Sequence, residues 1–246
     1  MKRWLTFVFV LALAVALGGV ASRVPEALVE VEAFKVTEVR LRGARFLTHE
    51  DVVEALDLSA EASVWDDTKD LEARLHDHPL VEDVKIHRRF PNALLVQVVE
   101  EEPVALFPNP TLEPVNESGR ILPIDPAFHK LDLPLMASAG LNGPGSLTQA
   151  GLRLLAGEIS RLAEGDPEFH SKISDFVLYP RGDMRVRISD SPVTLHLRPG
   201  TPSGRIQAGL RVLRDAQARF EEGAVVELDL RFDDQVVVRF GRAGGN

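Results

Sequence analysis

The chain has 246 residues, 45% of them hydrophobic, so it can bury one large core or two smaller ones. Its 28 basic and 37 acidic residues give a formal charge of −9, which argues against a protein that binds the phosphate backbone of nucleic acids. The absence of cysteine excludes disulfides, a thiolate nucleophile and a cysteine-ligated metal.

The amino terminus has the pattern of a membrane anchor. Two basic residues precede residues 4–21, in which Thr6 is the only polar side chain. A helix of this length spans roughly 27 Å, close to the hydrocarbon thickness of about 30 Å, and the positive charge before it keeps the amino end in the cytoplasm. We therefore expect a cytoplasmic tail over residues 1–3, a transmembrane helix over 4–21, and all later residues outside the cytoplasm.

A cleaved secretory signal is the alternative interpretation of this segment. Gly19 and Ala21 place small residues where a signal peptidase would cut before Ser22. The apolar run is longer than the roughly 7–15 residues of a typical signal, and Trp4 lies where an interfacial aromatic anchor is expected, so we favour a retained anchor.

Residues 34–103 predict a small domain with the element order β-α-α-β-β. Alternating polarity indicates strands over 36–42, around 84–88 and around 94–98. A first helix begins after Thr48, with Asp51 completing a capping box, and carries Val52, Val53 and Leu56. A second helix begins at Asp67 or Thr68, carries Leu71 and Leu75, and ends at His78-Pro79. Three strands can bury only one face, so we expect both helices on one side of the sheet.

Residues 104–240 predict a second α+β domain with an antiparallel sheet, followed by a flexible tail over 241–246. Periodicity and turn residues indicate its elements: strands at 104–107, 112–115, 121–122, 176–178, 185–188, 193–197, 225–231 and 235–240, and helices over 147–164 and 203–220. If the last strand is at a sheet edge, its unpaired backbone is a docking site or an aggregation hazard; it could equally be central.

The chain offers little that suggests catalysis. His76, His78 and His87 lie close in sequence, but their spacing is poor for a metal site. The acidic run 100–102 is typical of a solvated edge, and there is no G-x-S-x-G nucleophile elbow. Residues 181–183 match an adhesion tripeptide by letter only, and we interpret them as a turn. We expect no enzyme activity, no cofactor and no metal.

The chain resembles the bacterial cell-division family FtsQ/DivIB from the anchor to Phe240. The resemblance is strongest in residues 79–107, which contain Pro-Leu-Val, Val-Lys-Ile, Arg-Arg-Phe-Pro-Asn-Ala-Leu and Glu-Pro-Val-Ala in the family's order. Residues 39–43 resemble the first strand of the family's POTRA domain, 115–122 its hairpin, and 228–232 the Val-Asp-Leu-Arg-Tyr/Phe strand of its β domain.

The resemblance implies a non-catalytic division scaffold that links early and late division proteins at the septum, with its carboxyl-terminal domains outside the inner membrane. The POTRA domain is associated with recruitment, and the last β-strand binds bitopic partners, FtsB (DivIC) and FtsL-like proteins, by strand addition. The implied partner contacts are Phe232, Asp234, Gln235, Phe240, and Arg181, which pairs with an acidic partner group. For Phe232 and Phe240 the alternative is simple core packing.

Two features depart from the family pattern, and two rival functions would each require features of their own. The three-residue tail is short, and Leu197-Arg198-Pro199-Gly200 replaces the family's Leu-Gly, which leaves the register of the next helix open. A POTRA adaptor in outer-membrane protein assembly or polypeptide secretion would have repeated POTRA units and a β-barrel, whereas one such unit is found. A periplasmic hydrolase would need a convergent polar site.

Overall fold

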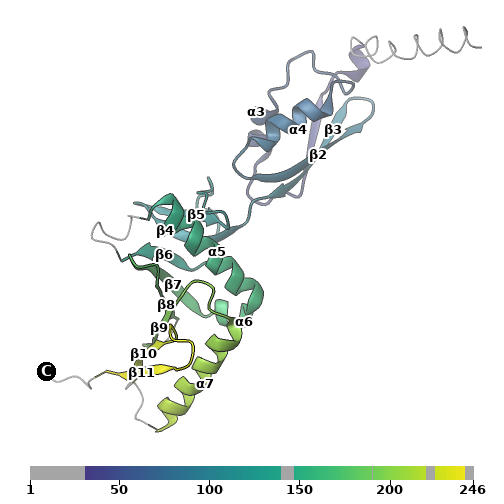
Figure 1. The fold of residues 1–246 in the computed structure, drawn as a ribbon. Coiled ribbons are helices and arrows are strands. Elements are labelled where there is room, and N and C mark those ends of the chain that lie inside the picture. The colour runs from purple at the N-terminus through teal and green to yellow at the C-terminus, as the bar shows by residue number, and fades with distance from the viewer. Residues whose placement is uncertain (1–30, 140–146, 190, 220–224, 242–246) are drawn as a thin grey trace, which may run out of the picture. The chain divides into compact units, whose positions relative to one another are not determined.

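The computed structural model describes residues 31–139, 147–189, 191–219 and 225–241 (Figure 1). The predicted anchor over residues 4–21 lies outside them, and within the described ranges no helix has the length and apolarity needed to cross a membrane. The chain divides into two compact units, the first ending at Glu101 and the second beginning at Glu102.

The first unit contains a three-stranded sheet and two helices. Its elements are η1 (Glu32–Phe34), β1 (Glu38–Arg42), α3 (His49–Leu56), α4 (Thr68–His76), β2 (Val81–Arg89) and β3 (Ala93–Glu100). The sheet order is β1-β3-β2, with β3 parallel to β1 and antiparallel to β2. The predicted β-α-α-β-β order is confirmed, and Figure 1 shows both helices on the same side of the sheet.

Side chains at the helix starts explain where the two helices begin. The Thr48 hydroxyl accepts from the Asp51 backbone N–H and the Asp51 carboxylate accepts from the Thr48 N–H, which is the predicted capping box of α3. Asp67 caps α4 through the Lys69 N–H. The inward positions are Val52, Leu56, Leu71 and Leu75, all buried. Val53 is 43% exposed, because successive helical residues are turned by about 100° from one another.

Glu100 corrects the prediction that residues 100–102 form a solvated edge. Its side chain is buried, and its carboxylate accepts hydrogen bonds from the backbone N–H groups of Arg45, Phe46 and Leu47, at 2.9, 3.0 and 2.7 Å. These N–H groups belong to the loop between β1 and α3, which has no ladder partner of its own. A buried carboxylate with several backbone donors is well satisfied, so Glu100 fixes this loop against β3.

The second unit is built on an eight-stranded sheet with the order β11-β10-β9-β8-β7-β6-β4-β5. The strands are β4 (Pro103–Pro108), β5 (Leu112–Asn116), β6 (Leu135–Ser138), β7 (Ile173–Leu178), β8 (Met184–Ile188), β9 (Thr194–Leu197), β10 (Val225–Asp229) and β11 (Val237–Phe240), and the helices are α5 (Gln149–Gly165), α6 (Pro167–His170) and α7 (Ser203–Arg219). Figure 1 shows α5 and α7 on one side of the sheet, and both contribute to a single hydrophobic cluster with the strands.

The sheet is mixed, so the prediction of an antiparallel sheet is wrong. β4 pairs with β6, β6 with β7, and β9 with β10 in parallel, whereas the other pairs are antiparallel. For two of these three parallel pairs the cause is that α5 lies in the connection from β6 to β7 and α7 in the connection from β9 to β10. A crossover helix returns the chain to the same end of the sheet, which makes the two strands run in the same direction.

Candidate functional site

The last strand, β11, lies at one edge of the eight-stranded sheet. Among the described strands it pairs with β10 alone, in antiparallel register. From the sequence this strand could lie either at an edge or in the centre of the sheet, and in the structure it lies at an edge. Phe240 in β11 is 46% exposed, and Phe232 in the turn before it is 40% exposed, so simple core packing does not account for either side chain.

The hydrogen-bond pattern of β10 shows which backbone groups of β11 face outward. The Leu230 N–H donates to the His196 carbonyl at 2.9 Å, so the main-chain polar groups of every second residue in this stretch point toward β9. Asp229 therefore points toward β11, where it pairs with Val237. The next residue, Val238, consequently directs its N–H and C=O away from β10 and toward the open edge.

The side chains of β11 are divided between the two faces of the sheet. Val236 and Val238 pack against the hydrophobic cluster beneath the helices. On the opposite face, the Arg239 guanidinium lies 2.9 Å from the Glu227 carboxylate of β10. β11 is thus held by one apolar face and one ion pair, while its outer backbone edge has no neighbouring described strand.

Arg205, near the start of α7, fixes the turn between β10 and β11. Its guanidinium donates to the carbonyl oxygens of Leu230, Asp233 and Gln235, at 3.1, 2.8 and 2.8 Å. Three backbone acceptors on one rigid planar group define the path of the turn more closely than any single contact. The exposed side chains of Asp234 and Gln235, two of the predicted partner contacts, are therefore presented from a fixed backbone.

Arg231 connects this hairpin to the turn that carries Arg181. The Arg231 guanidinium contacts the Asp229 carboxylate and the Asp183 carboxylate, each at 2.7 Å. Hydrogen bonding to Arg231 holds the pKa of the buried Asp229 carboxyl below its ordinary value, and the two carboxylates raise the pKa of Arg231. Asp183 ends the predicted turn, in which the Gly182 N–H donates to the Tyr179 carbonyl at 2.9 Å.

Arg181 lines a pocket of about 340 Å³ beside this ion-pair network. The other lining residues are Tyr179, Pro180, Asp183, His196 and Arg231. The Nε2 atom of His196 is buried without a hydrogen-bond partner among the described residues, and burial lowers the pKa of this imidazole. The Arg181 guanidinium makes no ion pair with any described residue. It can donate hydrogen bonds to an anionic group that enters the pocket.

Four of the five predicted contact residues lie at the β11 edge of the sheet, whereas Arg181 lies in the turn between the central strands β7 and β8, so the five do not form one compact cluster. Phe232, Asp234 and Gln235 lie in the turn at one end of β11, and Phe240 ends the strand at the other. Arg181 is joined to the turn through Asp183 and Arg231. Arg205 was not predicted as a site residue, because its position in an amphipathic helix gives no sign of its contacts with a distant turn.

The histidines do not form a metal site in the part of the chain that is described. The His87 ring lies 2.8 Å from the Gln97 side chain, and His78 Nδ1 accepts from the Leu80 N–H at 3.2 Å. Within residues 31–139, 147–189, 191–219 and 225–241, no group of three or more histidine, aspartate or glutamate side chains has an arrangement that could hold a metal ion.

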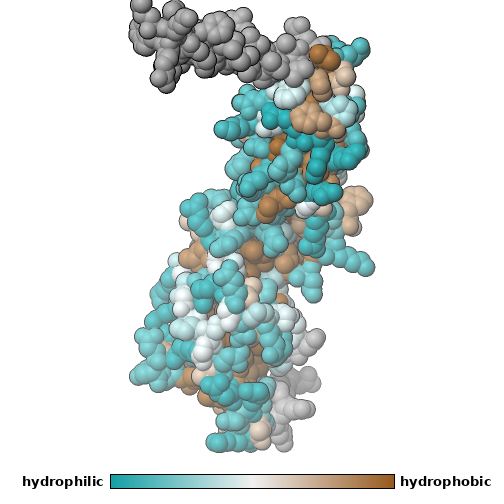
Figure 2. Space-filling view, turned by 90° about the vertical axis from the view of Figure 1, so that its right-hand side faces the viewer, coloured by the Kyte–Doolittle hydropathy of each residue, from teal (hydrophilic) through white to brown (hydrophobic). Residues whose placement is uncertain are grey.

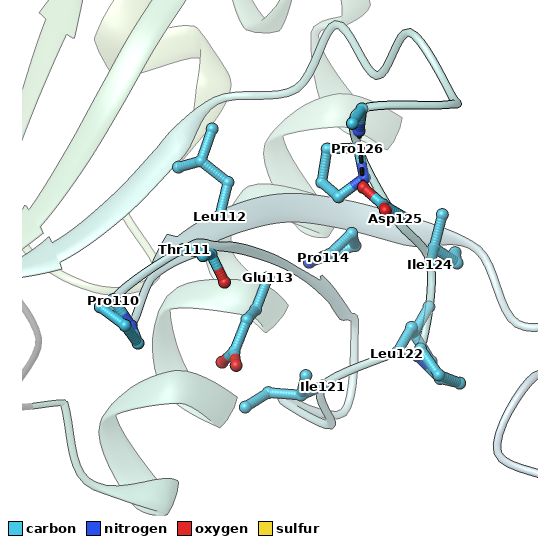
Figure 3. Close-up of a pocket in the computed structure, with 12 residues that line it drawn as sticks. Pro110, Thr111, Leu112, Glu113, Pro114, Ile121, Leu122, Ile124, Asp125 and Pro126 are labelled. Carbon is cyan, nitrogen blue, oxygen red and sulfur yellow. Dashed lines mark hydrogen bonds between the residues drawn. The ribbon is translucent and has the colours of Figure 1, made fainter.

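A larger hollow, of about 930 Å³, lies at the opposite edge of the sheet. It is lined by proline and aliphatic side chains of β5, of the turn before it and of the segment that follows it, among them Pro110, Leu112, Pro114, Ile121 and Ile124 (Figure 3). None of the five predicted contact residues lines it.

Comparison with known proteins gives two kinds of match. The model of a domain family described as "POTRA domain, FtsQ-type" matches residues 34–101. A protein named "Cell division protein FtsQ" from Anaeromyxobacter sp. (strain K) is 30% identical over 96% of this chain and 81% of its own length. A protein of the same name from Myxococcus fulvus (strain ATCC BAA-855 / HW-1) is 28% identical over 80% of this chain and 70% of its own length.

Proposed function

Because the chain belongs to the FtsQ family of cell-division proteins, we propose that it is a non-catalytic scaffold that links early and late division proteins at the septum. It is anchored in the inner membrane by residues 4–21, with its two folded units outside the cytoplasm. Its partners are bitopic division proteins of the FtsB and FtsL kinds, and it needs no cofactor.

The observation that carries this proposal is the open edge at β11. An exposed edge strand can pair with an extended segment of another chain, so that main-chain hydrogen bonds provide affinity and neighbouring side chains provide specificity. The outward N–H and C=O of Val238 supply the backbone groups, and Phe232 and Phe240 supply apolar contacts at the two ends. Arg181 pairs with an acidic side chain of the partner.

The test removes one outward hydrogen-bond donor and keeps the rest of the edge. In Val238→Pro the strand loses the N–H that would donate to a partner strand, and proline is tolerated where a strand's N–H faces outward at a sheet edge. Val238→Ala is the matched control, because it shortens the same side chain but retains the N–H. Both full-length proteins are purified in detergent, checked by urea unfolding, and titrated with the FtsB-like protein of the same organism.

We expect Val238→Pro to bind the partner at least about tenfold more weakly than Val238→Ala, which corresponds to about 1.4 kcal/mol. The two variants should differ little in urea midpoint. Equal affinities of the two variants would contradict strand addition at β11.

A further inference from the structure

Three aromatic rings form a cluster at the surface of the first unit, in which Phe90 is exposed and Phe34 and Trp65 are half-buried. The ring centroids of Phe34 and Trp65 are 5.9 Å apart, those of Trp65 and Phe90 5.0 Å, and those of Phe34 and Phe90 6.4 Å. Phe90 is 56% exposed, and the nearby Val31 is 41% exposed. Tan and brown side chains gather at this end of the first unit (Figure 2).

The cluster is built by three separate segments of the first unit. Phe34 ends η1, and its carbonyl accepts from the Val64 N–H at 2.9 Å, which places the loop before α4 beside it. Trp65 follows in that loop, and Phe90 begins the turn between β2 and β3. Because the backbone brings the three rings together while leaving Phe90 largely in water, the cluster is a surface feature of the fold and not an extension of its core.

The position of the cluster in the chain indicates what covers it. Only residues 22–30 separate the predicted membrane anchor from Val31, and nine residues reach at most about 30 Å even when fully extended. Phe34 lies in η1, the first element of the described residues, and so short a connection would hold the cluster close to the bilayer at high effective concentration.

We propose that the cluster of Phe34, Trp65 and Phe90 docks into the interfacial zone of the membrane in which the chain is anchored. This inference rests on the proposed anchor over residues 4–21. Aromatic rings concentrate at the level of the lipid headgroups, where their apolar bodies leave water without entering the hydrocarbon core. Docking removes Phe90 from water and restricts the orientation of the first unit relative to the bilayer.

The charges around the cluster select the kind of lipid surface. Asp66 and Asp67 follow Trp65, and Arg88 and Arg89 precede Phe90. Lys35, which follows Phe34, forms an ion pair with Glu61 at 2.8 Å. This mixed set lacks the basic excess that binds anionic lipids by electrostatic attraction. The contact is therefore with the interfacial zone of a zwitterionic bilayer, and it does not depend on an anionic headgroup.

Trp65 itself reports the contact. The chain has 2 tryptophans, so in a Trp4→Phe background Trp65 is the only one. The full-length Trp4→Phe protein is reconstituted into phosphatidylcholine vesicles that carry bromine on the acyl-chain carbons near the carbonyl, and its fluorescence is compared with that in unbrominated vesicles. Flotation of the vesicles in a density gradient shows separately whether the chain is anchored.

We expect bromine to quench the Trp65 fluorescence to less than half. Adding Phe90→Asp should restore most of the emission, and adding Phe128→Asp should not. Phe128 is a suitable control because it is an 84% exposed phenylalanine in the second unit. Urea unfolding checks that all variants are folded.

The outcomes separate the two proposals. If the protein floats with the vesicles but its Trp65 fluorescence is not quenched, the docking is overturned and the anchor stands. The same holds if the fluorescence is quenched but Phe90→Asp and Phe128→Asp relieve the quenching equally. Protein that does not float overturns the anchor and the docking together.

Discussion

The two edges of the eight-stranded sheet differ in whether further chain pairs with the edge strand. At the β5 edge the chain folds back, so that the Leu122 N–H donates to the Pro114 carbonyl at 2.8 Å and the Asn116 N–H donates to the Arg120 carbonyl at 3.0 Å. At the β11 edge no further described strand or bridge follows. An unprotected edge promotes unwanted pairing between chains. This difference between the two edges, as far as they are described, supports the proposal that β11 binds a partner strand.

Prolines add to the protection of the β5 edge. Pro110 lies in the turn between β4 and β5, and Pro114 lies within β5 itself (Figure 3). A proline cannot donate a hydrogen bond to an added strand, so these residues discourage pairing at this edge. The range from Val237 to Phe240 contains no proline.

The largest expected loss of stability is that of Gly119→Ala, which changes the turn that folds the chain back over the β5 edge. Gly119 has a φ of +78° in the turn that reverses the chain, and a Cβ at this position would lie 2.5 Å from the Arg153 backbone nitrogen of α5. The helix backbone cannot move away cheaply, so we expect a loss of about 3 kcal/mol in the free energy of unfolding. Urea unfolding measures the loss, and light scattering measures the self-association of the uncovered edge.

Gly182→Ala is the matched control for this substitution. Gly182 has a φ of +86°, but a Cβ there would meet no atom within 4 Å. Only the backbone conformation is then strained, and the expected loss is about 1 kcal/mol with no increase in scattering. Equal losses for the two variants would show that the approach to Arg153 does not matter.

The elements of both units that depend on local pattern could be predicted from sequence. The capping box of Thr48 and Asp51 and the periodicity of the two long helices involve residues within a few positions of one another, so they are visible in the sequence. The strand β6 was not predicted, because in four residues only Met136 is fully buried and no alternation can be recognised.

The features that could not be predicted depend on contacts between distant residues. The parallel pairing of β9 with β10 follows from the way α7 crosses the sheet, and an alternating strand pattern does not specify its direction. Glu100 has the same chemistry as its two neighbours in the acidic run, and only the fold places it under the N–H groups of a loop more than fifty positions earlier. The contact residues of the candidate site stay a prediction from the family resemblance. Nothing in the sequence indicates the role of Arg205, whose guanidinium fixes the turn that carries Phe232, Asp234 and Gln235.

A smaller effect is expected at the open edge from Arg231→Met. This change leaves the Asp229 carboxylate, which is 2% exposed, without its cation, while Asp183 remains partly in water. Removal of one partner of a buried pair costs about 3–5 kcal/mol, and the partial exposure of Arg231 reduces our expectation to about 2 kcal/mol at pH 7. Urea unfolding of the variant and of the parent protein gives the difference.

The pH dependence of this loss identifies its cause. The pKa of Asp229 is lower in the folded protein than in the unfolded chain, where it is near the ordinary value of about 4. The stabilisation by Arg231 is therefore fully present above that value and is lost as the pH falls through the folded pKa. The parent and Arg231→Met should converge in stability below pH 4, and a difference that persists unchanged at pH 3 would assign the loss to packing.

The smallest change in stability is expected from Arg205→Lys, which alters the turn before β11 and not the strand itself. A lysine retains the charge but cannot donate simultaneously to the carbonyls of Leu230, Asp233 and Gln235. We expect a loss of about 1 kcal/mol in unfolding free energy, because the turn is exposed and water replaces the lost donors. Binding of the FtsB-like partner should weaken by about fivefold, because a less ordered edge must be ordered on binding.

Arg211→Lys is the control for this variant, since Arg211 is an exposed arginine of the same helix. It should change neither stability nor affinity. A loss of affinity in Arg205→Lys that is absent from Arg211→Lys would mean that α7 contributes to partner binding by fixing the geometry of the open edge. Unchanged affinity in Arg205→Lys, with stability lowered as expected, would instead mean that the partner orders the turn by itself, and that the difference between the two edges is limited to their backbone hydrogen bonds.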